Sequence, residues 1–193
     1  MRLAIFGGSF DPPHVGHLLA AEDAIEQLTL DRVVLVPTAT QPLKVGRAVA
    51  TAEQRLAMAR LLVEGDGRYE VSAVEVERAG LSFTVDTLEH FAAAYPEAER
   101  FLLLGADVLA TFGQWREPER VLKLARTVVL ERAGDPAAAL PAGMDAKALM
   151  RLPTRRVDVS STEIRRRVGN GKSIRGFVTD SVAAFIARAG LYR

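Results

Sequence analysis

The chain has 193 residues, which is enough for one compact domain with its own hydrophobic core. Hydrophobic residues make up 49% of it and charged residues 25%, so the composition excludes an intrinsically disordered protein. The absence of cysteine excludes disulfides, thiolate metal sites and a catalytic thiol, and it favours a cytoplasmic location. The first apolar run, 3–6, is far shorter than the roughly 20 residues of a membrane span, so we expect no membrane association.

The net charge of +1 conceals an uneven distribution. Residues 1–150 carry 15 Lys and Arg against 21 Asp and Glu, whereas residues 151–193 carry 10 against 3. A basic segment of this kind suits a nucleic-acid patch, a solvated helix face or a cradle for a polyphosphate, and charge alone leaves all three open.

Apolar runs and stretches of helical periodicity alternate along the chain in sequence order. Buried strands are predicted at 2–6, 32–37, 69–76, 101–104, 127–130 and 156–159. Helices are predicted at 18–28, from a capping box at Thr51 to about 63, at 84–94, at 118–125, just after 160–162 and from a cap at Thr179. Residues 133–150, rich in Ala, Gly and Pro, are predicted to form an irregular surface excursion.

Strands that alternate with helices predict an α/β fold, with a doubly wound, Rossmann-like parallel sheet and helices on both faces. We expect a single domain over 1–193. In such sheets ligands bind beyond the carboxyl ends of the strands. The segments with unusual residues all follow predicted strand ends, at 7–17, 37–44, 105–107 and 160–167. The sequence therefore predicts one ligand site at that edge.

The first of these segments reads GGSFDPPHVGH, from Gly7 to His17. Two glycines allow the backbone to approach a ligand closely, and the helix that follows offers unpaired N–H groups to an anion. His14 and His17 lie three residues apart at the start of this helix, so both imidazoles can reach one phosphate. Histidines that merely cap the helix are the structural alternative. The position of His14 and His17 beside a glycine turn at a strand end favours a phosphate site over this alternative.

The segment from Ser160 to Arg167, SSTEIRRR, turns from a predicted strand into a helix. Hydroxyls, backbone N–H groups and then guanidinium groups follow in order, an arrangement that suits the β and γ phosphates of a nucleotide. A solvated basic helix with an N-cap is the alternative when this segment is considered alone.

Together the two segments resemble the signatures of the HIGH superfamily of nucleotidyltransferases. His14-Val15-Gly16-His17 matches the His/Thr-x-Gly-His signature, and Val159 to Arg165 is similar to the Ile-Ser-Ser-Thr-x-x-Arg signature. The longer string GGSFDPPHVGHL resembles the nicotinate-nucleotide adenylyltransferase family over twelve contiguous positions. The likeness extends over nearly the whole chain and is weakest from 133 to 155.

Further segments resemble the same family. Gln41-Pro42-Leu43-Lys44 keeps the lysine of the family's Pro-Pro-His-Lys but lacks its histidine, and a solvated loop lysine is the alternative. Ser82 to Thr87, the run Gly105-Ala106-Asp107 and the single Trp115 also match family segments. For Asp86 a plain helix-first-turn acid is the alternative, and for Trp115 core packing.

The resemblance implies transfer of AMP from ATP to nicotinate mononucleotide, a step of NAD biosynthesis, with Mg²⁺ bound mainly to the ATP phosphates. It implies small-molecule substrates and no nucleic acid, and it leaves self-association open. The C-terminal part, about 160–193, is expected to complete the ATP site. The implied catalytic residues are His14, His17, Lys44 and Arg165. The implied ATP-binding residues are Gly7, Gly8, Ser9, Phe10, Gly16, His17, Gly105, Asp107, Ser160, Ser161, Thr162 and Arg165. The implied mononucleotide-binding residues are Lys44, Thr84, Asp86 and Trp115. No residue is expected to ligate a metal directly.

Three alternatives remain at this point. The amide-specific nicotinamide mononucleotide adenylyltransferases differ only in the pyridine substituent, and Thr84 with nearby N–H groups favours the acid. Pantetheine-phosphate adenylyltransferases have a related signature but lack the SFTVDT, GAD and Trp set. A nucleotide sensor or RNA-binding regulator would use the basic tail without turnover.

Overall fold

The computed structural model describes residues 1–40, 42, 49–78, 80–135, 137, 139–140 and 145–193. The strands are β1 (Arg2–Gly8), β2 (Arg32–Pro37), β3 (Tyr69–Val71), β4 (Glu99–Gly105), β5 (Arg126–Arg132) and β6 (Leu149–Thr154). The α-helices are α1 (Val15–Leu28), α2 (Ala52–Leu62), α3 (Val74–Arg78), α4 (Thr84–Ala94), α5 (Ala106–Leu109), α6 (Pro118–Leu124), α7 (Ser161–Gly169) and α8 (Asp180–Arg188). The described residues also include the 3₁₀ helices η2 (Phe112–Gln114) and η3 (Ala146–Ala148).

The six strands form one parallel sheet in the order β3-β2-β1-β4-β5-β6. The chain moves outward from β1 to β3 on one side, then returns to β4 and moves outward to β6 on the other. This reversal between β1 and β4 is the point at which doubly wound sheets bind ligands. The predicted fold class is confirmed.

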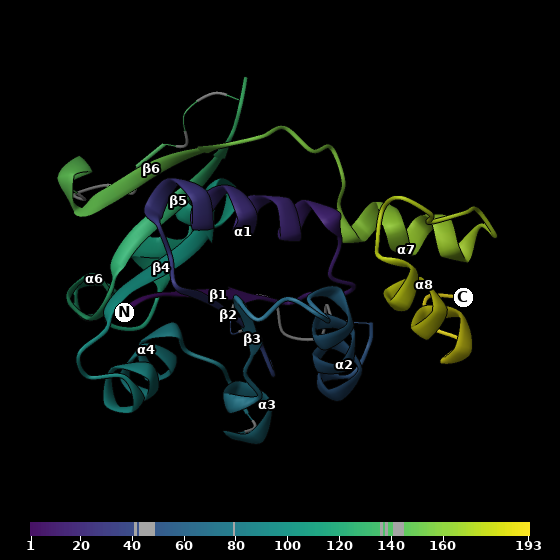
Figure 1. The fold of residues 1–193 in the computed structure, drawn as a ribbon, viewed down its shortest axis with the longest axis horizontal. Coiled ribbons are helices and arrows are strands. Elements are labelled where there is room, and N and C mark those ends of the chain that lie inside the picture. The colour runs from purple at the N-terminus through teal and green to yellow at the C-terminus, as the bar shows by residue number, and fades with distance from the viewer. Residues whose placement is uncertain (41, 43–48, 79, 136, 138, 141–144) are drawn as a thin grey trace.

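The sheet is covered on both faces, because alternate residues of its strands point to opposite sides. Ala4 and Phe6 of β1 pack in a core with residues of α1, α2, α7 and α8. Leu3 and Ile5 pack in a second core with residues of α4, α6 and η2. Figure 1 shows α1 and α4 on opposite sides of β1, with α7 beyond the amino-terminal end of α1. Burial on both faces explains why β1, β2, β4 and β5 are uninterrupted apolar runs.

Most predicted helix starts are confirmed at the residue level. Thr51 accepts a hydrogen bond from the Gln54 N–H, and the Gln54 side chain accepts one from the Thr51 N–H, as in the predicted capping box. Thr179 caps α8 by accepting from the Val182 N–H. No described helix is both long enough and apolar enough to span a bilayer.

Two strand predictions are wrong. The strand expected at 69–76 ends at Val71, and residues 74–78 form the helix α3 instead. The alternating valines Val74 and Val76 lie within one turn of this helix, and the buried residue is Glu75 between them. Residues 156–159 form no strand, and the sixth strand is instead β6, which overlaps the predicted irregular region 133–150 only at Leu149 and Met150. As an edge strand β6 pairs on one side only, so it tolerates Pro153 and shows a weaker apolar pattern.

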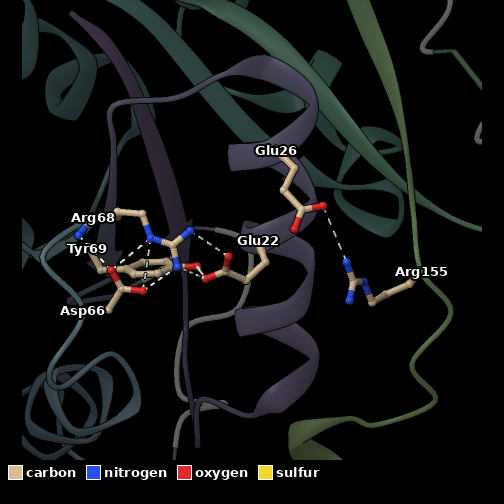
Figure 2. Close-up of polar contacts among 6 residues, drawn as sticks. All are labelled: Glu22, Glu26, Asp66, Arg68, Tyr69 and Arg155. Carbon is tan, nitrogen blue, oxygen red and sulfur yellow. Dashed lines mark hydrogen bonds and ion pairs between the residues drawn. The ribbon is translucent and has the colours of Figure 1, made fainter.

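Ion pairs tie β3 and the segment after β6 to α1 (Figure 2). Arg68 donates to both carboxylate oxygens of Glu22 at 3.0 and 2.9 Å, and the Tyr69 hydroxyl donates to Glu22 at 2.6 Å. Arg155 lies 3.9 Å from Glu26. It also donates to the buried Asp23 at 2.8 Å through Nε and at 2.7 Å through its backbone N–H. The Asp23 contacts hold the chain entering the 160–167 turn against α1.

Candidate functional site

A cavity of about 640 Å³ opens at the carboxyl ends of β1, β2, β4 and β5. It is lined by residues from every segment that the sequence marks at strand ends, apart from the positions outside the described residues. The predicted site residues along it are Gly7, Gly8, Ser9, His14, Gly16, His17, Thr84, Gly105, Asp107, Trp115, Ser160 and Ser161. Segments more than 140 residues apart in sequence therefore line the same cavity.

The turn after β1 is shaped to leave room above its backbone. A Cβ added to Gly7 would meet no atom within 4 Å, so no neighbouring group of the described chain requires glycine there. A Cβ on Gly16 would approach the Nδ1 atom of His14 to 3.0 Å, so this glycine makes room for the imidazole. Because Gly7 lines the cavity, its bare backbone leaves space for a ligand group.

The two imidazoles lie side by side at the start of α1, with ring centroids 3.7 Å apart. The backbone N–H of His14 donates to Nδ1 of His17 at 3.1 Å. Nδ1 of a neutral His17 is therefore an acceptor, which leaves the proton on Nε2. Burial and the nearby positive charge of Arg132 lower the pKa of His14 to about 4. Burial, His14 and Arg132 lower the pKa of His17 well below its usual range. Both rings are thus neutral near pH 7.

The turn before α7 contacts the first turn directly. Ser160 caps α7 by accepting from the Glu163 N–H at 3.2 Å, as the sequence predicts for a serine at a helix start. The hydroxyl of Ser161 donates to the Pro12 carbonyl at 2.8 Å, and Arg165 donates to the Asp11 carbonyl at 2.7 Å. The two turns therefore converge on one side of the cavity, as the sequence predicts.

The opposite side of the cavity is formed by the start of α4 and by η2. Thr84 begins α4, where free N–H groups favour an anion. Trp115 is partly buried and packs on Phe112 with a centroid distance of 5.1 Å, so it is at once a core residue and part of the cavity wall. Asp86 pairs with Arg116 at 3.6 Å, and Arg116 in turn lies over the ring of Phe83.

Some predicted residues lie away from the cavity lining. Phe10 is buried beneath the turn with its ring 5.0 Å from that of His17, so it supports the imidazole from below. Asp86, Thr162 and Arg165 are also outside the lining, and the Thr162 hydroxyl accepts from Arg165 at 3.3 Å. Lys44 lies outside the described residues, so its predicted role stays a prediction.

Two arginines that sequence reasoning missed contribute to the site. Arg132 ends β5, lines the cavity and acts on both histidines through its charge. Its position at a strand end could have revealed it. Arg55 of α2 is 2% exposed and donates to the carbonyls of Ser9, Ala39 and Ala50 at 2.7, 3.0 and 3.3 Å. It fixes the glycine turn to the segment after β2, a long-range role with no local sequence signal.

Asp11 links the same turn to the C-terminal end of the chain. Its carboxylate accepts from the N–H groups of Val49 and Ala50 at 2.8 and 3.2 Å and from the Tyr192 hydroxyl at 2.7 Å. With both oxygens engaged, this carboxylate is a scaffold group. Among the residues described, no set of three or more His, Cys, Asp or Glu side chains could hold a metal ion.

Comparisons with known proteins agree with this geometry. The cytidylyltransferase-like family model matches residues 5–167, which include both turns. A protein of Gemmatimonas aurantiaca named "Probable nicotinate-nucleotide adenylyltransferase" is 51% identical over 197 residues, covering 100% of this chain and 93% of its own. A protein of Thermus thermophilus with the same name is 44% identical over 193 residues, with both chains fully covered. The chain belongs to the nicotinate-nucleotide adenylyltransferase family.

Solved structures extend the likeness of fold. The nicotinic acid mononucleotide adenylyltransferase of Plasmodium falciparum complexed with NaAD matches with a TM-score of 0.75 at 16% identity, covering 99% of this chain and 97% of its own. The same enzyme complexed with APC matches with a TM-score of 0.75 at 18% identity, covering 99% and 96%. Members of this family therefore share the doubly wound sheet described above even where few residues are identical.

Proposed function

We propose that this chain transfers the AMP unit of ATP to the 5′-phosphate of nicotinate mononucleotide, giving nicotinate adenine dinucleotide and pyrophosphate. The observation that carries this proposal is the meeting of the Gly7–His17 turn and the Ser160–Arg165 turn at one cavity. Relatives that are 44 to 51% identical over the whole chain bear the name of this activity.

The reaction needs no covalent intermediate with the protein. An oxygen of the mononucleotide 5′-phosphate attacks the α-phosphorus of ATP in line, a new P–O bond forms, and the bond to the β-phosphate bridging oxygen breaks. Pyrophosphate leaves with the electron pair of that bond. The protein aligns two anions and stabilises charge on the five-coordinate phosphorus, and alignment alone lowers a barrier of this kind by about 7 to 11 kcal/mol.

We assign roles from the geometry and, for Lys44, Gly105, Asp107 and Trp115, from the family resemblance. Nε2–H of His17 donates to an α-phosphate oxygen, and His14 lies beside the same phosphate or the leaving bridge. Arg132 adds positive charge at the same side of the cavity. Ser161, Thr162, Arg165 and Lys44 contact the β and γ oxygens. Gly105 and Asp107 contact the adenosine, while Trp115 stacks on the pyridine ring and the start of α4 receives its carboxylate.

Mg²⁺ is expected to enter with ATP. The described residues offer no three-ligand cluster, and the Asp11 carboxylate is engaged by N–H and O–H donors. These features fit an ion held chiefly by phosphate oxygens and water, which Mg²⁺ prefers. The ion would neutralise charge on the triphosphate.

A pyrophosphate-release assay with ATP tests the proposal and its competitors together. Nicotinate mononucleotide is expected to give the highest kcat/KM, because free N–H groups at the start of α4 favour a carboxylate. A higher kcat/KM for the amide mononucleotide would assign the chain to the amide-specific enzymes. Turnover of pantetheine phosphate alone would assign the chain to the pantetheine-phosphate adenylyltransferases. Nucleotide binding without pyrophosphate release would indicate a nucleotide sensor.

A further inference from the structure

Glu75 is a buried carboxyl group in the cavity wall that the proposed reaction does not use. It lies on α3, is 4% exposed, and lines the cavity together with Ser82, Phe83 and Thr84. The Thr87 hydroxyl donates to Oε1 of Glu75 at 2.6 Å. Oε2 has no hydrogen-bond partner among the described residues, which is unusual for a carboxylate oxygen away from water.

The groups around Glu75 act in opposite directions on its charge. Burial raises its pKa above the usual range, and this effect is the largest. The hydroxyls of Thr87 and Ser82 and the positive charges of Arg78 on α3 and Arg55 on α2 lower the pKa. The first turn of α4 also carries Asp86, which is paired with Arg116 at 3.6 Å. The net result is a carboxyl group that holds its proton to a higher pH than an exposed glutamate.

A buried network connects this carboxyl group to the phosphate-binding turn. Arg55 donates to the carbonyls of Ser9 and Ala39, and the Ala39 N–H donates to the Ser82 hydroxyl at 3.0 Å. Ser82 and Thr87 both act on Glu75. Glu75 therefore has a fixed position at the end of the cavity assigned to the pyridine ring.

We propose that Glu75 is a specificity-determining residue that sets the charge of the Ser82–Thr84 end of the cavity and so selects the pyridine substituent. This inference rests on the proposed function. As a neutral acid, Glu75 adds no negative charge near the substrate carboxylate, and its O–H is a potential donor. As an anion in a low-dielectric wall it repels the carboxylate but not the uncharged amide.

The test compares kcat/KM for nicotinate mononucleotide with kcat/KM for nicotinamide mononucleotide as the pH rises. The ratio of the two values cancels the titration of ATP, of the shared 5′-phosphate and of any group that acts on both reactions. Over a pH series from about 4 to about 9, the acid-to-amide ratio of the wild-type protein is expected to fall by about tenfold as Glu75 loses its proton, with the midpoint of the fall above the pKa of an exposed glutamate.

Glu75→Gln keeps the shape of the side chain but removes its charge, so its ratio should stay constant within about twofold over that range. Glu77→Gln is the matched control, because Glu77 lies on the same short helix with its side chain exposed, and its ratio should follow the wild type. Thermal unfolding of each variant at pH 7 checks that the comparison is between folded proteins.

Thr87→Val provides a second arm that does not depend on the folding of Glu75→Gln. It removes a hydrogen-bond donor that favours the ionised carboxyl group of Glu75. The pH at which the acid-to-amide ratio is halfway through its fall should therefore be higher in this variant than in the wild type. A flat ratio in the wild type, or a ratio in Glu75→Gln that falls with the wild type, overturns the inference. Absence of pyrophosphate release with both mononucleotides would instead overturn the proposed function.

Discussion

The two imidazoles at the start of α1 have different hydrogen-bonding capacities. Nδ1 of His17 already accepts from the backbone of His14, so only Nε2 remains for a substrate. Nδ1 of His14 is buried without a partner in the described chain and lies against Gly16. These contacts support our proposal that His17 is the donor to the phosphate, a choice between the two histidines that the spacing of the motif leaves open.

Two substitutions of His17 separate this role from packing. His17→Asn keeps an acceptor near the position of Nδ1 and loses Nε2, so kcat/KM should fall by about 30-fold, equivalent to about 2 kcal/mol of transition-state stabilisation. His17→Gln places an amide donor nearer to Nε2 and should retain more activity than His17→Asn. Equal activities of the two variants, or wild-type kcat/KM in His17→Asn, would reject the donor role.

The low pKa of His14 predicts how stability depends on pH. Below about pH 6.5 the unfolded chain binds a proton at His14, whereas the folded protein binds it only near pH 4, so acid favours unfolding. Between pH 7 and pH 5 this single group should remove about 2 kcal/mol from the free energy of unfolding. Urea titrations of the wild type and His14→Gln at both pH values measure the difference, which should be smaller in the variant. A parallel loss in both proteins would contradict the assignment.

Elements buried on both faces could be predicted from sequence, and others could not. β1, β2, β4 and β5 are continuous apolar runs, so their strands follow from composition alone. β6 lies at the sheet edge and buries only some of its residues, so its apolar pattern is weak. The alternation of apolar residues at 156–159 predicts a strand, but the structure has none there. The glycine, histidine and serine positions of the site are contiguous motifs. Arg55 and Glu75 act through long-range burial, which no local pattern records.

At the level of elements, Arg55 of α2 should be a major source of rigidity. Its buried guanidinium joins the turn after β1 to the segments before and after residues 41–48 through three carbonyls. Arg55→Lys keeps the charge but cannot reproduce this planar set of donors, so the free energy of unfolding should fall by about 3 kcal/mol. Urea unfolding measures this change.

Arg60→Lys on the exposed face of the same helix is the control for that experiment, and it should change stability by no more than about 0.5 kcal/mol. If Arg55→Lys unfolds at the same urea concentration as the control, the three contacts contribute little to stability. The position of the glycine turn would then depend on other groups.

At the scale of the whole molecule, the fold brings remote segments to one edge. The reversal of strand order between β1 and β4 opens the cavity, and Asp23, Asp11 and Tyr192 hold the C-terminal third of the chain against α1 and the first turn. Of the ten basic residues in 151–193, Arg155 lines the cavity and Arg165 donates to the first turn at the Asp11 carbonyl. These two arginines have a use in the proposed reaction that requires no nucleic-acid partner.

The most direct test is a crystal structure with a non-hydrolysable ATP analogue and Mg²⁺. One triphosphate should lie in the cavity with oxygens within about 3.5 Å of Nε2 of His17 and, at its other end, of Ser161 or Arg165. A triphosphate held by one turn alone, or bound outside the cavity, would contradict the joint site on which the proposed function depends.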